Sequence, residues 1–286
     1  TPSPGIPQAL IPDRVSASSY QRLINCPYLF FAADGLRLKA LEELSDELKK
    51  SDYGERIHLI LQTFHSGHKQ FGKAFSPDIN NHTRHEAEKY LCKISEKVFL
   101  ADLENNVLHR SWLHRWTKHI PSYIDWQMQH QRDWKCSQSE TKLETVIAGS
   151  DDETQAIALT IYGRLDRVDK NRATGTHAII DYKTGRTASQ DDVDNGENVQ
   201  LSTYALLDNE ATDVSYLSVD SSARKVESKS RLSDADLLQN REENRKRLTE
   251  LFRQMKNRQA LPAWGDDSVC SYCDFSGLCR KPEWQE

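Results

Sequence analysis

The sequence predicts a mixed α/β fold that carries a helical insertion, and two features of its hydrophobic pattern indicate this. Up to about residue 138 the apolar residues mostly recur at helical spacing, whereas three segments between residues 141 and 185 follow strand patterns, separated by clusters of Gly, Asn and Asp. Helix and strand patterns then alternate towards the C-terminus. The chain of 286 residues is long enough for a large hydrophobic core, and we expect one domain.

The predicted elements divide this single domain, residues 1–286, into five parts. Pro-rich residues 1–15 are expected to form a tether, and residues 16–72 to hold the N-terminal helices, including 36–50 and 53–72. Residues 73–138 are the insertion, which looks helical from 84 to 132. The core at 139–220 is expected to contain antiparallel strands in 141–149, 154–169 and 176–185, a helix at 197–209 and a strand at 214–220. Residues 221–286 are expected to contain a charged helix at 231–259, ended by Pro262, and a Cys-rich tail.

Composition excludes several classes of protein. The net charge of −5 argues against a protein that coats nucleic acid through its overall charge, although a local basic groove is compatible with it. No window approaches 18 consecutive apolar residues, so we expect no membrane span. No signal peptide is visible, and the missing initial Met indicates a domain cut from a longer chain. No P-loop motif is present, so we expect no ATP motor of that type.

The six cysteines indicate a metal or cluster site rather than disulfides. Without an export signal we expect a cytoplasmic, reducing location, where disulfides are rare. Cys270, Cys273 and Cys279 follow one another as C-x2-C-x5-C in the last 17 residues. Thiols at such close spacing often hold a metal or an iron–sulfur cluster. Cys92 and Cys136 are interpreted as ordinary buried thiols.

Two aspartates are predicted to face each other across neighbouring strands. If the hairpin loop is centred between Ala173 and Thr174, Asp166 lies directly opposite Asp181, with Cβ atoms roughly 4.5–5.5 Å apart. Two like charges at that distance repel unless a cation binds between them, and carboxylate ligands suit Mg²⁺ or Mn²⁺. Lys183 shares a face with Asp181 and can reach the same site. The alternative is an ordinary hairpin with exposed charges, and a slip of one residue would break the register.

Three further residues are weaker candidates. Gln200 and Tyr204 are four apart on a predicted helix, so they can turn polar atoms towards the same site, although a pair on a helix surface is the simpler interpretation. His58 lies among aliphatic residues, which is typical of a core histidine but also compatible with a metal ligand.

Seven pieces of sequence, spread over residues 16–280, are similar to the motifs of one nuclease family. The chain resembles the RecB-like branch of the PD-(D/E)XK superfamily, especially the C-terminal nuclease domains of AddB-type helicase–nuclease subunits and related CRISPR-adaptation nucleases. Leu165 stands where the superfamily name has Pro, as is usual in this branch. The matching pieces are SASSYQRLINCPYLF (16–30), GERIH (54–58), Glu144, GRLDRVD (163–169), IDYKTG (180–185), QLSTY (200–204) and CSYCDFSGLCR (270–280).

The resemblance implies a restriction-endonuclease-like mixed sheet flanked by helices, and a role for each matching residue. His58, Asp166, Asp181 and the Tyr182 carbonyl would bind Mg²⁺ or Mn²⁺, and Asp166, Asp181, Lys183, Gln200 and Tyr204 would be catalytic, with Glu144 as a supporting acid. Cys26, Cys270, Cys273 and Cys279 would hold a [4Fe–4S] cluster that joins the two chain ends. Zinc bound by four cysteines is the alternative that the spacing leaves open.

The expected function is therefore metal-dependent DNA hydrolysis. The resemblance implies an exonuclease in recombination and repair, acting on DNA with single-stranded ends beside a helicase region or subunit. Arg164 and Arg167 are candidate phosphate contacts near the site, and the basic residues of 223–258 form either a wall of a DNA groove or a solvated helix face. Two alternatives from other classes are a non-catalytic DNA-holding module and a zinc-stapled interaction domain.

Overall fold

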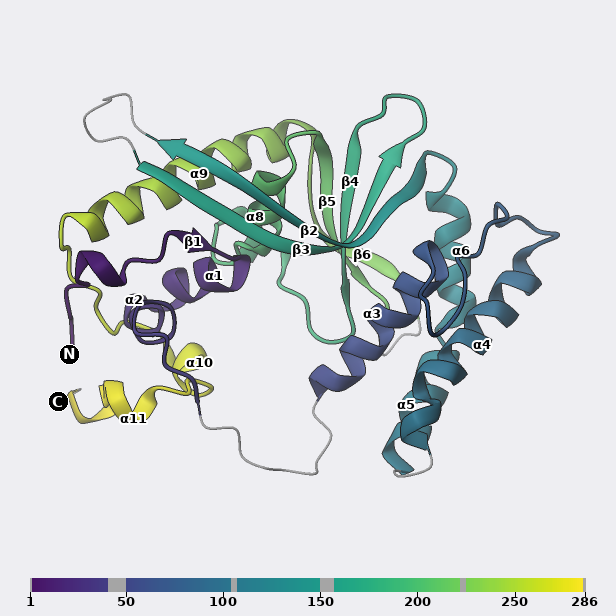
Figure 1. The fold of residues 1–286 in the computed structure, drawn as a ribbon, viewed down its shortest axis with the longest axis horizontal. Helices are drawn as coiled ribbons and strands as arrows, with labels where there is room; N and C mark the ends of the chain where they lie inside the picture. Colours follow the sequence, from purple (N-terminus) through teal and green to yellow (C-terminus); the bar gives the residue numbers. More distant parts are fainter. Residues whose placement is uncertain (1, 41–49, 104–106, 150–156, 222–224, 285–286) are drawn as a thin grey trace.

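The computed structural model describes residues 2–40, 50–103, 107–149, 157–221 and 225–284. A six-stranded mixed sheet runs through its centre, in the order β1-β3-β4-β5-β6, with β2 also paired to β3 (Figure 1). The strands are β1 (Arg14–Val15), β2 (Trp134–Gly149), β3 (Ile157–Asn171), β4 (His177–Lys183), β5 (Ala211–Ser218) and β6 (Glu227–Ser233). β2, β3 and β4 are antiparallel neighbours, as predicted, and β5 is parallel to β4.

Helices cover both faces of the sheet, which confirms the mixed α/β prediction. The α-helices are α1 (Ala17–Asn25), α2 (Pro27–Phe30), α3 (Lys50–Ser66), α4 (Arg84–Leu103), α5 (Val107–Thr117), α6 (Ile120–His130), α7 (Gln190–Asp194), α8 (Gln200–Leu207), α9 (Asp234–Lys256), α10 (Asp267–Cys270) and α11 (Ser276–Cys279). Shorter turns are η1 (Gln8–Leu10), η2 (Phe31–Gly35) and η4 (Lys281–Trp284). None of the described helices is long and apolar enough to cross a membrane.

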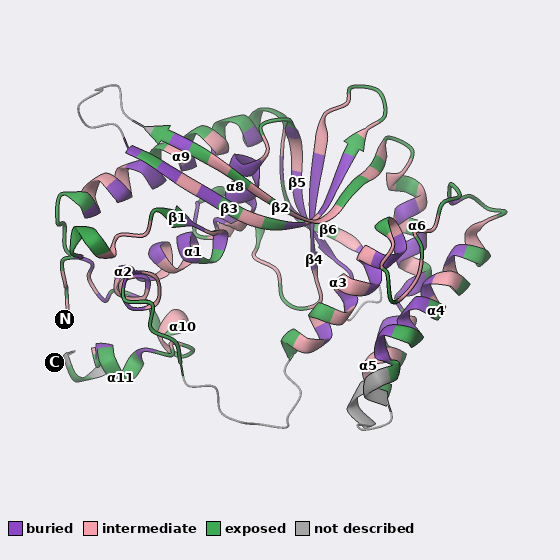
Figure 2. Ribbon diagram, in the orientation of Figure 1, coloured by how far each residue is buried: buried purple, intermediate pink, exposed green. Residues whose placement is uncertain are grey.

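Two hydrophobic clusters hold these layers together. One packs α1, α8 and α9 against β3, whereas the other packs α3 to α6 against β4 and β5. The buried residues line the contacts between helices and sheet, and exposed residues cover the outer helix faces (Figure 2). Within β4 the faces separate as predicted, because Ile179 belongs to the first cluster while Ile180 and Tyr182 belong to the second. The helices α4 to α6 account for the helical stretch expected at 84–132 and lie at the opposite end of the molecule from both termini (Figure 1). β2 begins at Trp134, within residues 73–138 that were expected to form the insertion.

Three sequence predictions need correction. Residues 2–15 are not a free tether: Ile6 is buried, β1 pairs with β3, and the Pro2 and Pro4 carbonyls accept hydrogen bonds from the backbone of the C-terminal segment. The charged helix begins only at Asp234, because 227–233 form β6. The helix expected at 53–72 ends at Ser66. Most of the helix expected at 36–50 lies outside the described residues.

Candidate active site

Three acidic residues lie in a row across three adjacent strands. The register between β3 and β4 pairs Arg167 with Ile180 and Val168 with Ile179, which is the predicted register and sets Asp166 opposite Asp181. Between β2 and β3, Glu140 lies between the paired residues Ser139 and Thr141 and therefore opposite Asp166. Three carboxylates at one level of a sheet repel one another unless positive charge lies near them.

The strands β3 and β4 separate where the aspartates lie. Their last paired residues are Arg167 and Ile180, and beyond them the Tyr182 N–H donates to Asp166 Oδ2 at 2.8 Å. Burial and the neighbouring Asp166 carboxylate raise the pKa of Asp181 to about 6. The register sets the two aspartates on neighbouring strands, but Asp181 does not belong to the group of His58, Glu140 and Asp166 whose ligand atoms lie within 4.8 Å of one another.

His58 reaches the acidic row from α3. Its Nδ1 lies 3.3 Å from Asp166 Oδ1 and 3.8 Å from Glu140 Oε1, and its Nε2 lies 3.0 Å from the Tyr182 carbonyl oxygen. Burial opposes a charge on the ring, but the hydrogen bonds to Asp166 and Glu140 outweigh it and raise the pKa of His58 to about 10. Only the neutral imidazole has a lone pair for a cation, so a metal bound by His58 would displace one of its protons.

Gly54 allows α3 to approach the end of β4. It precedes His58 by one helical turn, so both lie on the same face of α3. A Cβ atom at Gly54 would lie 3.3 Å from Thr184 Oγ1, which is a tight contact. The residue after Lys183 thus packs directly against the helix that carries His58.

Lys183 and Gln200 complete the site on the other side of Asp181. Lys183 Nζ lies 2.7 Å from Asp181 Oδ2 and donates to Gln200 Oε1 at 2.9 Å. Gln200 Nε2 donates to Asp181 Oδ1 at 3.0 Å and to the Tyr204 hydroxyl at 2.8 Å. The Gln200 amide therefore holds the acid and the amine of the site in fixed relative positions.

The hydroxyl groups of Tyr204 and Tyr216 hold Asp181 and Gln200 in position. The Tyr204 hydroxyl donates to Asp181 Oδ1 at 3.1 Å, and the Tyr216 hydroxyl donates to Gln200 Oε1 at 3.0 Å. Burial raises the pKa of both phenols, so they stay neutral donors at physiological pH. The Tyr216 ring also lies under Lys183 Nζ, 4.9 Å from its centroid. Sequence reasoning did not identify Tyr216, because nothing in a strand pattern marks one tyrosine among its neighbours.

The donor set fits a hard divalent cation. One ligand atom each from His58, Glu140 and Asp166 lie within 4.8 Å of one another. Asp181 Oδ2 is buried and, despite the ion pair with Lys183, accepts no hydrogen bond of good geometry from the described residues. Carboxylate and carbonyl oxygens with one imidazole match the ligand preference of Mg²⁺ or Mn²⁺.

The family model of the PD-(D/E)XK nuclease superfamily matches residues 14–280, which include every residue of this site. The chain belongs to the PD-(D/E)XK nuclease superfamily. The mixed sheet flanked by helices is the restriction-endonuclease-like fold of this superfamily. The acidic row, Lys183 and Gln200 are therefore the candidate active site of a PD-(D/E)XK domain.

Several curated relatives match this domain within much longer chains. Two uncharacterized proteins, of Rickettsia felis and Rickettsia conorii, are 25% and 24% identical over 68% and 73% of this chain. One subunit of an ATP-dependent helicase/deoxyribonuclease of Desulforamulus reducens is 27% identical over 67% of it. The matched regions cover 21%, 24% and 17% of these three proteins, so the chain spans a quarter or less of their length.

Two predicted site residues lie elsewhere. Glu144 pairs with Tyr162 across β2 and β3, half-exposed, and forms an ion pair with Arg14, four residues away from the acidic row. Arg167 is fully buried, where its Nε donates to Asp169 at 2.6 Å, so it cannot contact a DNA phosphate. Arg164 does lie at the site, 58% exposed, with its Nε 2.5 Å from Glu140 Oε2.

The four cysteines assigned to the cluster line one pocket between α2 and the C-terminal tail. Cys26 comes from the N-terminal part, and Gly265 packs against it so closely that a Cβ atom there would lie 3.3 Å from Cys26 Cβ and 3.5 Å from Cys270 Sγ. Burial raises the pKa of Cys273 and Cys279, and nearby cysteines add to this. No three of these sulfur atoms come within 4.8 Å of one another in the described part of the chain.

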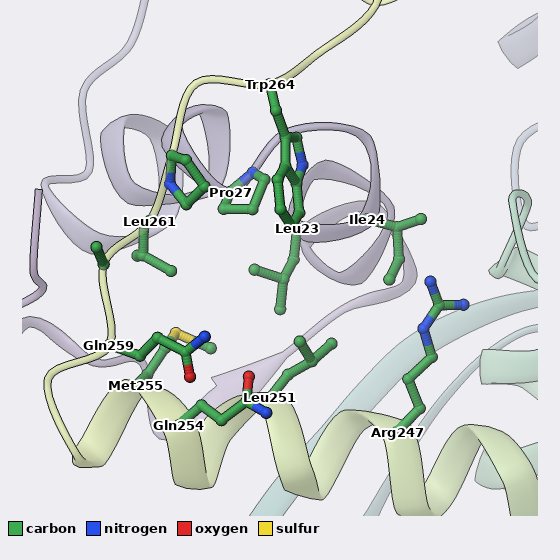
Figure 3. A pocket seen from close by; sticks show the side chains of 12 residues that line it. Leu23, Ile24, Pro27, Arg247, Leu251, Gln254, Met255, Gln259, Leu261 and Trp264 are labelled. Atoms are coloured by element: carbon green, nitrogen blue, oxygen red, sulfur yellow. The ribbon is translucent and has the colours of Figure 1, made fainter. Parts of the chain in front are cut away.

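The basic residues of α9 are largely engaged in contacts within the fold. Arg245 and Arg253 pair with acids three residues earlier on the helix, and Arg241 donates to backbone carbonyls that include that of Ala205. Arg247 donates to the Gly196 carbonyl and lines an apolar pocket formed with α1 and the segment after α9, over which the exposed Trp264 lies (Figure 3). These contacts favour the interpretation of α9 as a solvated and structural helix.

Proposed function

We propose that this domain is a metal-dependent deoxyribonuclease that hydrolyses phosphodiester bonds of DNA. The observation that supports it best is the row of Glu140, Asp166 and Asp181 across three strands, with Lys183 beside Asp181. A sheet has no structural reason to place three carboxylates at one level, whereas a divalent cation and a phosphate would make use of them.

His58, Glu140, Asp166, Asp181 and the Tyr182 carbonyl would hold Mg²⁺ or Mn²⁺. When bound, the ion supplies an activated water and charge stabilisation for the phosphate. Lys183 is the group that would approach the attacking water or a phosphate oxygen, since its ammonium is held at 2.7 Å from Asp181. Gln200, Tyr204 and Tyr216 keep Asp181 and Lys183 in this arrangement.

The similarity to a subunit of a helicase/deoxyribonuclease supports a more specific role. We propose an exonuclease that processes DNA with single-stranded ends in recombination and repair, in the cytoplasm, together with a helicase region or subunit. Arg164 remains the proposed phosphate contact, because it is exposed beside Glu140.

The four cysteines of the pocket are proposed to hold a [4Fe–4S] cluster. A tetrahedral zinc site with Zn–S bonds of about 2.3 Å brings its sulfur atoms to roughly 3.8 Å from one another. Among Cys26, Cys270, Cys273 and Cys279, no three sulfur atoms lie as close together as that, which suits a larger group.

Substitution of Asp181 tests the nuclease proposal directly. Asp181→Ala is expected to abolish Mg²⁺-dependent cleavage of a labelled DNA while DNA affinity in EDTA is kept, because the residue acts on the metal rather than on the DNA. Asp191→Ala, which removes an exposed acid of α7, is the matched control and should cleave normally. Full cleavage by Asp181→Ala, or wild-type cleavage in EDTA, would contradict the proposed metal-dependent site. Wild-type protein that binds DNA but does not cleave it with Mg²⁺ would instead favour a non-catalytic DNA-holding module.

A further inference from the structure

The helical insertion places an exposed arginine on a buried carboxylate. Arg115 belongs to α5, and its Nε lies 2.7 Å and 2.9 Å from the two oxygens of Asp220. The Arg115 side chain is 55% exposed, whereas that of Asp220 is 1% exposed. The Arg115 guanidinium is therefore held on its buried side by Asp220, while the rest of the group is exposed to solvent.

Two further groups lie beside Asp220. His119 Nε2 lies 2.9 Å from its Oδ1, and the Tyr53 side chain lies near the carboxylate without a hydrogen bond of good geometry to it. Burial would raise the pKa of Asp220, but the neighbouring His119, Arg115 and Tyr53 side chains lower it, so the carboxylate stays ionised. Because Asp220 is held in place by its neighbours, the Arg115 guanidinium that bonds it has little freedom to move.

The two terminal amino groups of the Arg115 guanidinium are available to a ligand. It lies over the ring of Tyr53, 5.6 Å from the centroid, which restricts its plane. Arg115 bonds Asp220 through Nε, and its terminal amino groups make no hydrogen bond to any residue within the described ranges. Those groups are the planar fork that matches two oxygens of a phosphate.

This arginine lies at the same edge of the sheet as the catalytic lysine. Lys183 pairs with Ser218 at the end of β5, and the Val219 N–H donates to the Lys183 carbonyl at 3.0 Å, so Asp220 follows one residue later. On the other side, Tyr53 precedes Gly54, which packs against Thr184. Both elements that hold Arg115 are thus continuous with those that hold Lys183 and His58.

We propose that Arg115 binds a phosphate of the DNA strand beside the active site, with Asp220, His119 and Tyr53 as its positioning residues. This inference rests on the proposed nuclease function and assigns the helical insertion a part in substrate binding. A purely structural role would not need the exposed fork, because His119 already pairs with the Asp220 carboxylate. Holding the guanidinium in place before DNA binds removes part of the side-chain entropy cost of the contact.

A salt titration of DNA binding tests the proposal. We would measure the affinity of the whole chain for a fluorescein-labelled duplex with a single-stranded tail, in EDTA, at salt concentrations from about 50 to 200 mM. Arg115→Gln is expected to weaken binding and to reduce the slope of log K against log salt by about 0.7–0.9, the value of one phosphate contact. Arg110→Gln, on the same helix and exposed, removes an equal charge and should leave the slope unchanged.

Asp220→Asn separates positioning from net charge. It removes the anchor but makes the protein more positive, so a general charge effect would tighten DNA binding whereas loss of positioning weakens it. Arg115→Lys, which keeps the charge without the fork, should recover only part of the affinity, and thermal unfolding confirms that each variant is folded. If wild-type protein binds and folded Arg115→Gln shows the same slope, this inference is wrong. If wild-type protein does not bind DNA, the proposed function fails as well.

Discussion

Glu140 has a backbone φ of +54°, in the left-handed region that residues with a Cβ rarely adopt. Such a conformation costs roughly 1–3 kcal/mol and persists where the surrounding structure enforces it, often at functional sites. Here it occurs in the strand residue that faces Asp166, with the Glu140 side chain only 9% exposed between His58 and Arg164. The strained residue thus contributes the third carboxylate of the row.

Glu140 and Glu144 provide a matched pair of substitutions for the metal site. Glu140→Gln is expected to weaken Mn²⁺ or Mg²⁺ binding by at least about tenfold, because it replaces a negatively charged carboxylate ligand with a neutral amide. Glu144→Gln makes the same change four residues away, beside Arg14, and this variant should bind metal like the wild type. Isothermal titration with each metal measures both. Equal metal affinity of the two variants would show that Glu140 is not a ligand.

The difference between these glutamates shows how far sequence reasoning reaches at the residue scale. The pairing of Asp166 with Asp181 was predictable, because a short loop with turn residues fixes the register of their hairpin. The connection between β2 and β3 includes residues 150–156, and no short turn motif sets its register. The motif resemblance pointed to Glu144, and only the pairing of the strands brings Glu140 to the site.

At the scale of elements, the environment of β3 changes along its length. From Ile157 to Leu165 buried residues mostly alternate with more exposed ones, but Arg167, Val168 and Asp169 are all buried. The insertion covers the second face there, and its residues Tyr123 and Gln127 hydrogen-bond Arg167. Alternation in the sequence predicts a solvent-facing arginine, because a strand pattern carries no information about a helix that later packs over it.

The buried ion pair between Arg167 and Asp169 is expected to stabilise the packing of the helical insertion on β3. Burial would raise the pKa of Asp169, but Arg167 and His130 outweigh it and hold the pKa well below its usual value of 3.8. Asp169→Asn leaves the buried Arg167 charge without its partner, which typically costs about 3–5 kcal/mol. Chemical denaturation at pH 7 measures this loss, and Glu250→Gln, which breaks the exposed pair with Arg253, should cost less than about 1 kcal/mol.

The pH dependence of this pair has a definite sign. Because the folded pKa of Asp169 is lowered, its contribution is complete above the unfolded value of 3.8 and is lost as pH falls below it. The stability difference between wild type and Asp169→Asn should therefore shrink on acidification below about pH 4. If the difference in unfolding free energy stays constant on acidification, or is absent at pH 7, the ion pair does not stabilise the fold in this way.

β6 was missed for a related reason. Within it only Ser230 and Leu232 are buried, while Lys229 and Arg231, which flank Ser230, are exposed. An alternation this short, in a segment rich in charged residues, does not distinguish an edge strand from the first turn of the long helix that follows. Pairing with β5, where Leu232 meets Val214, decides the conformation.

At the scale of the whole molecule, the two chain ends are joined at one place. The Leu261 and Ala263 N–H groups donate to the carbonyls of Pro4 and Pro2, and the Tyr28 N–H donates to the Pro262 carbonyl at 3.3 Å. The cysteine pocket lies directly beside these contacts. Cys26 and Cys270 are about 240 residues apart in the sequence, so a group bound by both closes a loop that contains the sheet and the insertion.

A bound cluster at this position should therefore stabilise the entire domain. Closing a loop of this length removes chain entropy worth roughly 5 kcal/mol from the unfolded state, by the relation that describes covalent cross-links. Cys270→Ser is expected to lose the iron and to lower the midpoint of thermal unfolding by roughly 10 °C or more. Cys92→Ser, in the helical insertion, is the control and should keep both.

Iron analysis, visible absorbance and thermal unfolding of the same preparations separate the possible results. Loss of iron together with a lower midpoint supports a cluster that acts as a clasp, since the bound group then contributes to folding. Stoichiometric zinc without iron in the wild type would overturn the cluster and leave a zinc clasp, whose thiolates would have to move closer together than the structure shows. An unchanged midpoint in iron-free Cys270→Ser would mean that the backbone contacts of Leu261 and Ala263 alone hold the two ends together.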